Sequence, residues 1–299
     1  MAQVDIILPT ETATHELPVV RSIGMTDLRD ALAKGLDDFW ALPTHVIFLS
    51  LIYPIVGIAL GSATFGYDLI PLLFPLAAGF ALVGPFAAIG LYELSRRREQ
   101  GLDTSWRHAF DIVHSPSIGA ILALGLLLLA IFGLWIAVAN AIYVAQFGYE
   151  TPTPSTFARN VLTTPQGHGL ILIGNAVGFL FAVVAFSLSV ISFPLLLDRH
   201  VGAAVAMITS IKAILKNPLT MAVWGAFVAG ALVVGSLPFL LGLAVVMPIL
   251  GHSTWHLYRK LIEPDLSPRP QFQPQPRGRR YGADLPVSLF IPSKPGEDR

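Results

Sequence analysis

Two histidines four residues apart, His252 and His256, are the residues of this sequence best placed to do chemistry. That spacing brings both imidazoles to one face of a helix, and His45 begins an apolar run at the same expected membrane level. Imidazole pairs can hold haem or a metal ion, so these three residues are weak candidates for a cofactor site. The alternative, which we favour, is that they are interfacial histidines bonded to backbone, lipid headgroups or each other. We therefore predict neither a cofactor nor a metal site.

A second group of side chains could bind anions. Arg96-Arg97-Arg98 directly follows one apolar stretch, and Lys212 and Lys216 directly precede another. Basic residues beside a membrane span fix its orientation and contact anionic lipid, each contributing about 1 kcal/mol near the surface. We expect these five residues to contact lipid or a partner protein.

The remaining sequence carries no recognisable catalytic pattern. It has no nucleotide-binding loop, nucleophile elbow or paired-carboxylate arrangement, and without cysteine it cannot build disulfides, thiolate zinc sites or iron–sulfur clusters. The centres of its long apolar stretches lack Asp, Glu, Lys and Arg, which usually mark proton and ion paths through a membrane. Nineteen basic and nineteen acidic residues give no sign of a nucleic-acid partner. We predict a protein that is not an enzyme.

The elements that must position these residues are membrane helices. The composition is 54% hydrophobic and 13% charged, with a mean hydropathy of +0.66, whereas soluble domains carry about 25% charged residues. A span needs about 20 apolar residues to cross a core about 30 Å thick. The uncharged intervals predict six spans, two of them folded at Gly235-Ser236-Leu237-Pro238: about 45–66, 69–92, 117–147, 169–197, and the two halves of 217–258.

The positions of the basic residues predict the orientation. Eighteen of the nineteen fall in segments on one side of the predicted spans, and only Arg159 falls on the other. Because basic residues are retained in cytoplasmic loops, both termini should be cytoplasmic in a multi-pass protein of the inner (plasma) membrane. Residues 1–25 have no signal-peptide pattern and should form a mobile arm. Residues 263–299 are rich in Pro and should form a cytoplasmic tail.

The predicted membrane domain, 26–262, contains one unit three times, at about 26–98, 101–200 and 201–261. Each copy is an interfacial amphipathic helix, a bend at proline, and a hairpin of two spans. The copies share one orientation, so they would be parallel repeats. The fold class is therefore an all-α membrane protein with six transmembrane helices in three parallel repeats.

The interfacial helices carry apolar stripes. Thr26 is expected to cap the first helix, and Asp103 or Thr104 the second. In the first helix Asp38 belongs to the expected wet side, and in the third we expect the polar side opposite the stripe to contain Thr209, Ser210, Lys212 and Lys216. The stripes of the first and third helices are Leu28, Ala31, Leu32, Leu36 and Phe39, and Met207, Ile208, Ile211, Ile214 and Leu215.

Two stretches carry a resemblance to a known family: DLRDALAKGLDDFWALPTHVIFLSLIYPIVGIALG and SFPLLLDRHVGAAVAMITSIKAILKNP. They resemble an uncharacterised family of bacterial integral membrane proteins catalogued as domain of unknown function 2189, and the resemblance covers about 23–261. Some members of that family are labelled as candidate cytochrome c oxidase subunits. An oxidase catalytic subunit would need more spans and histidines at helix centres, so the label implies at most an accessory or assembly role and transfers no site residues.

These observations favour a non-enzymatic bacterial inner-membrane protein that binds lipid or another membrane-protein complex at its cytoplasmic side. Two alternatives stay open at this point. The repeat and the prolines within the spans would suit a facilitator for a neutral or lipid-like solute. The histidines would suit an accessory or assembly factor of a respiratory oxidase.

Overall fold

The computed structural model describes residues 17–42, 70–149, 152–238 and 241–264. The chain divides into two compact units, Met1–Glu263 and Pro264–Arg299, and the description below concerns the first. Its described regular elements are helices, and one isolated β-bridge pairs Val20 with Ile262. The all-α class is thus confirmed. The α-helices (α) and 3-10 helices (η) are α1 (Met25–Ala41), η1 (Ile70–Leu72), α4 (Leu73–Ala87), α5 (Ile89–Glu99), η2 (Trp106–His114), α6 (Ile118–Phe147), α7 (Pro154–Thr163), α8 (Pro165–Ser189), α9 (Ser192–Asp198), α10 (Ala203–Lys216), α11 (Pro218–Ser236) and α12 (Leu243–Leu261).

Three described stretches are long and apolar enough to cross a membrane. They are α6, the run Pro165–Asp198 that contains α8 and α9, and α11. The segments Leu73–Gly79 and Gly84–Glu99 would make a fourth span, bent by 41°. Pro85 lies inside α4 near this bend, where its missing N–H removes a helical hydrogen bond.

The predicted spans agree with these helices only in part. The predictions 117–147 and 169–197 match α6 and the α8–α9 run, and α11 ends at Ser236, within the predicted turn. The prediction 45–66 lies outside the described residues. The sixth prediction corresponds to α12, which is not among the helices that qualify as spans by length and apolarity. Its second half contains His252, His256, Arg259 and Lys260, and these polar groups lower its hydropathy. Six spans and a threefold repeat therefore remain predictions.

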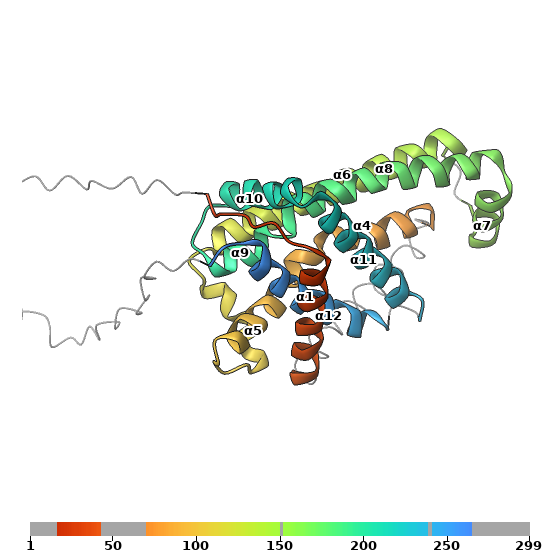
Figure 1. Cartoon of the computed structure of the whole chain (residues 1–299). Coiled ribbons are helices and arrows are strands. Elements are labelled where there is room, and N and C mark those ends of the chain that lie inside the picture. Colours follow the sequence, from red (N-terminus) through yellow and green to blue (C-terminus); the bar gives the residue numbers. More distant parts are fainter. Residues whose placement is uncertain (1–16, 43–69, 150–151, 239–240, 265–299) are drawn as a thin grey trace, which may run out of the picture. The chain divides into compact units, whose positions relative to one another are not determined.

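Two of the long helices, α6 and α8, lie side by side (Figure 1). Trp135 of α6 lies between Gly178 of α8 and Gly79 of α4, where added Cβ atoms would come within 2.9 and 2.8 Å of its ring. Its indole N–H donates to the carbonyl of Pro75 at 2.9 Å. A large aromatic side chain facing small residues lets the helix backbones approach closely, as is typical of membrane helices.

The three predicted interfacial helices are present as α1, η2 and α10, but their caps differ from the prediction. Gly24, not Thr26, is the N-cap of α1, and the carboxylate of Asp27 accepts a hydrogen bond from the Gly24 N–H at 2.9 Å. Ser105 is the N-cap of η2. Asp103 does not cap the helix itself; its carboxylate accepts a hydrogen bond of 3.1 Å from the backbone N–H of the N-cap residue, Ser105.

The buried face of α1 is rotated from the predicted stripe. Gly35 and Asp38 are buried together with Leu28, whereas Leu36 is exposed. A Cβ at Gly35 would lie 2.5 Å from the backbone nitrogen of Ser253, so α1 and α12 pack with almost no space between them. The prediction that Asp38 faces water is wrong, because polar partners on neighbouring helices compensate its burial.

The two sides of α10 have different environments. Ile208, Ile211 and Leu215 of the apolar stripe are 45%, 36% and 73% exposed. Thr209 and Ser210, on the opposite side, are fully buried against the rest of the protein. The Ser210 hydroxyl accepts a hydrogen bond from the backbone N–H of Ile191 at 3.3 Å. Small polar residues thus form the helix–helix contact, and the stripe points away from the protein.

Candidate functional site

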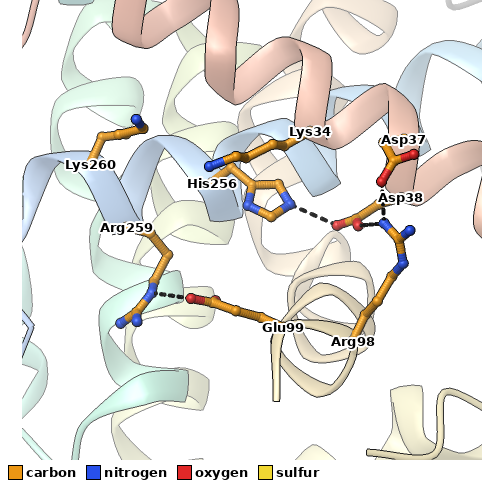
Figure 2. Close-up of a pocket in the computed structure, with 8 residues that line it drawn as sticks. All are labelled: Lys34, Asp37, Asp38, Arg98, Glu99, His256, Arg259 and Lys260. Carbon is orange, nitrogen blue, oxygen red and sulfur yellow. Dashed lines mark hydrogen bonds and ion pairs between the residues drawn. The ribbon is translucent and has the colours of Figure 1, made fainter. Parts of the chain in front are cut away.

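A buried carboxylate, Asp38, lies where α1, α5 and α12 meet. Its side chain is only 4% exposed. Oδ2 accepts a hydrogen bond from the Ser95 hydroxyl at 2.6 Å and another from Nε2 of His256 at 2.8 Å. Oδ1 is paired with the guanidinium of Arg98. Groups from two other helices therefore satisfy both oxygens, and Figure 2 shows the His256 and Arg98 contacts.

His252 extends this network into the protein interior. Its Nδ1 lies 2.6 Å from the Ser95 hydroxyl, and both residues are fully buried. Because the Ser95 proton is donated to Asp38, the hydroxyl must accept from His252, which assigns the proton to Nδ1. Nε2 of His252 then carries a lone pair, and it has no hydrogen-bond partner within the described part of the chain.

Serine, histidine and aspartate also form nucleophilic triads, but the order here is different. In a triad the histidine stands between the carboxylate and the serine and accepts the serine proton. Here Ser95 stands between Asp38 and His252 and donates its proton to Asp38. Ser95 is also fully buried. The arrangement therefore joins three helices in an order that differs from that of a triad.

The electrostatics of Asp38 depend on its partners. Burial by itself raises the pKa of the carboxyl group, but hydrogen bonds from His256, Ser95 and Arg98 outweigh it and lower the pKa to about 2. Asp38 is therefore ionised at neutral pH, and removing its partners would leave a buried charge without compensation.

An open pocket of about 500 Å³ lies beside Asp38 (Figure 2). Its lining contains four Lys or Arg side chains and three carboxylates, and several of them are paired with each other. Arg259 donates to Glu99 at 3.0 Å, for example. The pocket can hold water or a small polar solute, but its lining has little net charge. The lining residues are Lys34, Asp37, Asp38, Arg98, Glu99, His256, Arg259 and Lys260.

Two further carboxylates near α5 and α9 are buried. Glu93 is bound by Arg96 through two hydrogen bonds of 2.7 Å each. Asp198 accepts a hydrogen bond from the Tyr258 hydroxyl at 2.7 Å, and Arg259 lies 3.7 Å from it. Asp38 thus connects α1 with α5 and α12, and Asp198 connects α9 with α12, whereas the Glu93–Arg96 pair lies within α5.

The structure places the predicted basic cluster within ion pairs of the chain itself. Arg96 binds Glu93, Arg97 donates to the carbonyl of Asp103 at 2.6 Å, and Arg98 binds Asp38. The sequence held a signal for the first pair, because Glu93 lies three residues before Arg96 on a helix. Contact of these arginines with lipid or a partner stays a prediction.

The other predicted site residues are distributed as follows. Lys212 is exposed on α10, and Lys216 donates to the carbonyl of Val20 at 2.7 Å. His45 lies outside the described residues. His252 and His256 lie on one face of α12, each directed at the Asp38–Ser95 pair.

Sequence reasoning missed Asp38 and Ser95, the residues that connect the two histidines. Both appeared as ordinary polar residues, and Ser95 is 57 residues from Asp38 in the chain. Within the described ranges no group of three or more His, Cys, Asp or Glu side chains is arranged to hold a metal ion.

Comparison with known proteins gives one match. No curated protein and no solved structure matches the chain. Residues 73–198, from α4 to the end of α9, match the family described as "Predicted integral membrane protein (DUF2189)". The two stretches that suggested this family from the sequence lie mostly outside the matched segment. The resemblance to this family is nevertheless confirmed over residues 73–198, where the chain is similar to proteins described as predicted integral membrane proteins.

Proposed function

We propose that this chain is a non-enzymatic, multi-pass protein of the bacterial inner membrane that binds anionic phospholipid at its cytoplasmic interface. The observation that carries the proposal is the outward face of α10. Ile208, Ile211 and Leu215 are exposed there, and Lys212 is exposed beside them. Apolar side chains next to a lysine suit the boundary between headgroups and acyl chains, because the apolar groups enter the bilayer while the ammonium reaches the phosphates.

The position of α10 along the chain supports a location at this boundary. Only Asn217 separates it from α11, one of the helices long and apolar enough to cross a membrane. α10 must therefore lie close to the level at which α11 enters the bilayer. The two other interfacial segments are similar: Phe110 and Val113 are exposed on η2 just before α6, and Trp40 is exposed at the end of α1.

The non-enzymatic part of the proposal rests on the way reactive side chains are paired. The Ser95 hydroxyl donates to Asp38, and Asp38 is held ionised by three donors. These contacts use the groups that a catalytic site would need free. Nothing in the described part of the chain favours the facilitator or the respiratory-accessory hypothesis over lipid binding, and both stay predictions.

We also propose the six-span topology with cytoplasmic termini and three parallel repeats. The segment 20–23 supports the last hairpin of this topology. Asn217, at the start of α11, donates to the carbonyl of Arg21 at 3.0 Å, and Ile262, just after α12, forms a β-bridge with Val20. The beginning of α11 and the end of α12 therefore lie at one level. If α11 crosses the membrane, α12 must return across it.

Lipid binding can be tested with one substitution on α10. Lys212→Gln removes a charge without disturbing the bond between Lys216 and Val20. We expect retention of anionic phospholipid by the purified protein to fall about fivefold, which corresponds to about 1 kcal/mol for one basic residue. Native mass spectrometry of the protein in detergent with added phosphatidylglycerol would measure the bound lipid.

Arg159→Gln is the matched control, because Arg159 is exposed on α7 at the predicted opposite side. It should leave retention unchanged. Equal losses in both variants would indicate general charge attraction and contradict a site at α10. If Lys212→Gln instead released a co-purified protein while lipid stayed bound, the face would be a protein interface.

A further inference from the structure

His108 of η2 lies between two carboxylates. Its Nδ1 is 2.6 Å from Oδ2 of Asp111, and its Nε2 is 3.0 Å from Oδ2 of Asp103. Carboxylates at neutral pH only accept hydrogen bonds, so each ring nitrogen must carry a proton. A neutral imidazole has one N–H and can keep only one of the two bonds. Both contacts can be hydrogen bonds at the same time only when His108 is an imidazolium ion.

The carboxylates join two parts of the chain through His108. Asp103 precedes η2, whereas Asp111 belongs to its second half. Arg97 of α5 faces the same cluster, donating to the Asp103 carbonyl at 2.6 Å and lying 3.4 Å from Asp111. Glu93 lies behind Arg97 at 3.6 Å. α6, which also contacts η2, has no Asp, Glu, Lys, Arg or His.

These charges determine how His108 responds to pH. The hydrogen bonds to Asp111 and Asp103 raise the pKa of His108, while the Arg97 charge opposes the shift. A raised folded-state pKa means that the stabilisation is present below the unfolded value and is lost as pH rises through the folded value. The two-sided contact should therefore weaken on the alkaline side of about pH 6.5.

The segment held by His108 depends on such contacts. η2 is a 3-10 helix of nine residues, whereas runs longer than about four residues are uncommon because their hydrogen bonds are poorly aligned. Its inner side packs through Ala109 against Gly90, where an added Cβ would lie 3.2 Å from the Ala109 Cβ. Phe110 and Val113 are exposed on its outer side.

We propose that His108 is a proton-operated clamp on η2, and that loss of its proton releases the segment and withdraws Phe110 and Val113 from the bilayer surface. The second part rests on the proposed lipid contact; the first part stands on the His108 geometry alone. The site would make the cytoplasmic surface of this protein responsive to pH in the range where histidine titrates.

Hydrogen exchange tests the clamp. We would compare amide protection factors over residues 102–114 in lipid nanodiscs at about pH 6 and about pH 9, on either side of the histidine range. Protection should fall at the higher pH in the parent protein. His108→Gln should show the low protection at both pH values, because it has one donor nitrogen in place of the two ring nitrogens and carries no positive charge. His114→Gln, which changes an exposed histidine of the same segment, should keep the pH dependence.

Equal protection at both pH values in the parent, or a pH dependence that survives in His108→Gln, would overturn the clamp. The His108 pKa measured by NMR on the unmodified protein provides a second check if the variant does not fold. A value at or below about 6.5 would equally overturn it.

A separate measurement distinguishes failure of the lipid contact from failure of the clamp. The chain has no cysteine, so Val113→Cys can carry a single polarity-sensitive dye. Brominated lipids should quench that dye strongly at about pH 6 and weakly at about pH 9. Absence of quenching at both pH values would contradict the contact of η2 with lipid. The His108 clamp would then be tested by the hydrogen-exchange result alone. Equal quenching at both would show that the contact exists but does not respond to His108.

Discussion

At the scale of single residues, Asp38 has the most consequential environment in the described chain. It combines near-complete burial with an ionised state, and Ser95, His256 and Arg98 each contribute a hydrogen bond or ion pair. A charge in such a place is stable only while its partners remain. Its type and position on an amphipathic helix predicted a wet side chain. The partners that reverse this prediction come from α5 and α12, and periodicity along α1 cannot reveal them.

Asp38→Asn should strongly destabilise the protein. The amide cannot balance the charge of Arg98 and would turn donors toward Ser95 and His256, so we expect a loss of about 3–5 kcal/mol, as for a broken buried ion pair. Unfolding in detergent, followed by circular dichroism, would measure it. Asp37→Asn is the matched control, since Asp37 is 70% exposed but also binds Arg98, and it should cost at most about 1 kcal/mol. Similar losses for the two variants would refute the assignment.

Asp38 should also control stability in acid. Its pKa is lowered to about 2 in the folded protein, below the usual value of about 3.9 in an unfolded chain. The sign follows from this difference: the contribution of Asp38 is complete above the unfolded value and is lost as pH falls toward the folded value. We expect the melting temperature of the parent to drop between about pH 4 and pH 2 more steeply than that of Asp38→Asn. Parallel curves would show that other carboxylates dominate the acid response.

At the scale of elements, the sequence predicted where helices run better than which side of each packs inward. α6, the α8–α9 run and the break between α10 and α11 follow from uncharged intervals and from proline, which are local signals. The orientation of a helix about its axis depends on its neighbours. The buried side of α10 contains Thr209 and Ser210, because small side chains allow close packing, while the apolar stripe points away from the protein.

The contact between α1 and α12 gives a prediction at this scale. Gly35→Ala would place a Cβ 2.5 Å from the backbone nitrogen of Ser253 and 2.7 Å from its Cα. Backbone atoms cannot move aside without separating the helices, so we expect a loss of about 1–3 kcal/mol from overpacking, or more. Thermal unfolding in detergent would measure it.

Gly174→Ala provides the comparison for Gly35→Ala. Gly174 also lies in a helix, α8, but an added Cβ there meets nothing within 4 Å. Alanine is favoured over glycine in helices by roughly 0.5–1 kcal/mol, so this variant should be neutral or slightly stabilised. If Gly35→Ala behaved in the same way, α1 and α12 would not be in close contact.

At the scale of the whole molecule, the described chain separates apolar surface from polar contacts. α6, α8 and α11 expose leucine, valine and phenylalanine along much of their length. The buried carboxylates instead join α1, α5, α9 and α12. Composition alone predicted the membrane class, because a water-soluble protein with so many apolar residues would need a far larger share of charged residues on its surface. The candidate site was predicted only as far as the histidine pair, because its remaining members are brought together by tertiary packing.

The crossing of the membrane by α12 is the whole-molecule question that labelling can answer. Asn217 at the start of α11 and Ile262 at the end of α12 both contact residues 20–23. If α11 spans the membrane, the loop after α11 should therefore lie on the opposite side of the membrane from these contacts. In the cysteine-free parent, Leu237→Cys and Ser155→Cys should react with a membrane-impermeant maleimide in intact spheroplasts. Gln100→Cys should react only after permeabilisation, because the positive-inside rule places that loop in the cytoplasm. Labelling of Gln100→Cys from outside would reverse the orientation, whereas protection of Leu237→Cys alone would show that α11 and α12 do not cross as a hairpin.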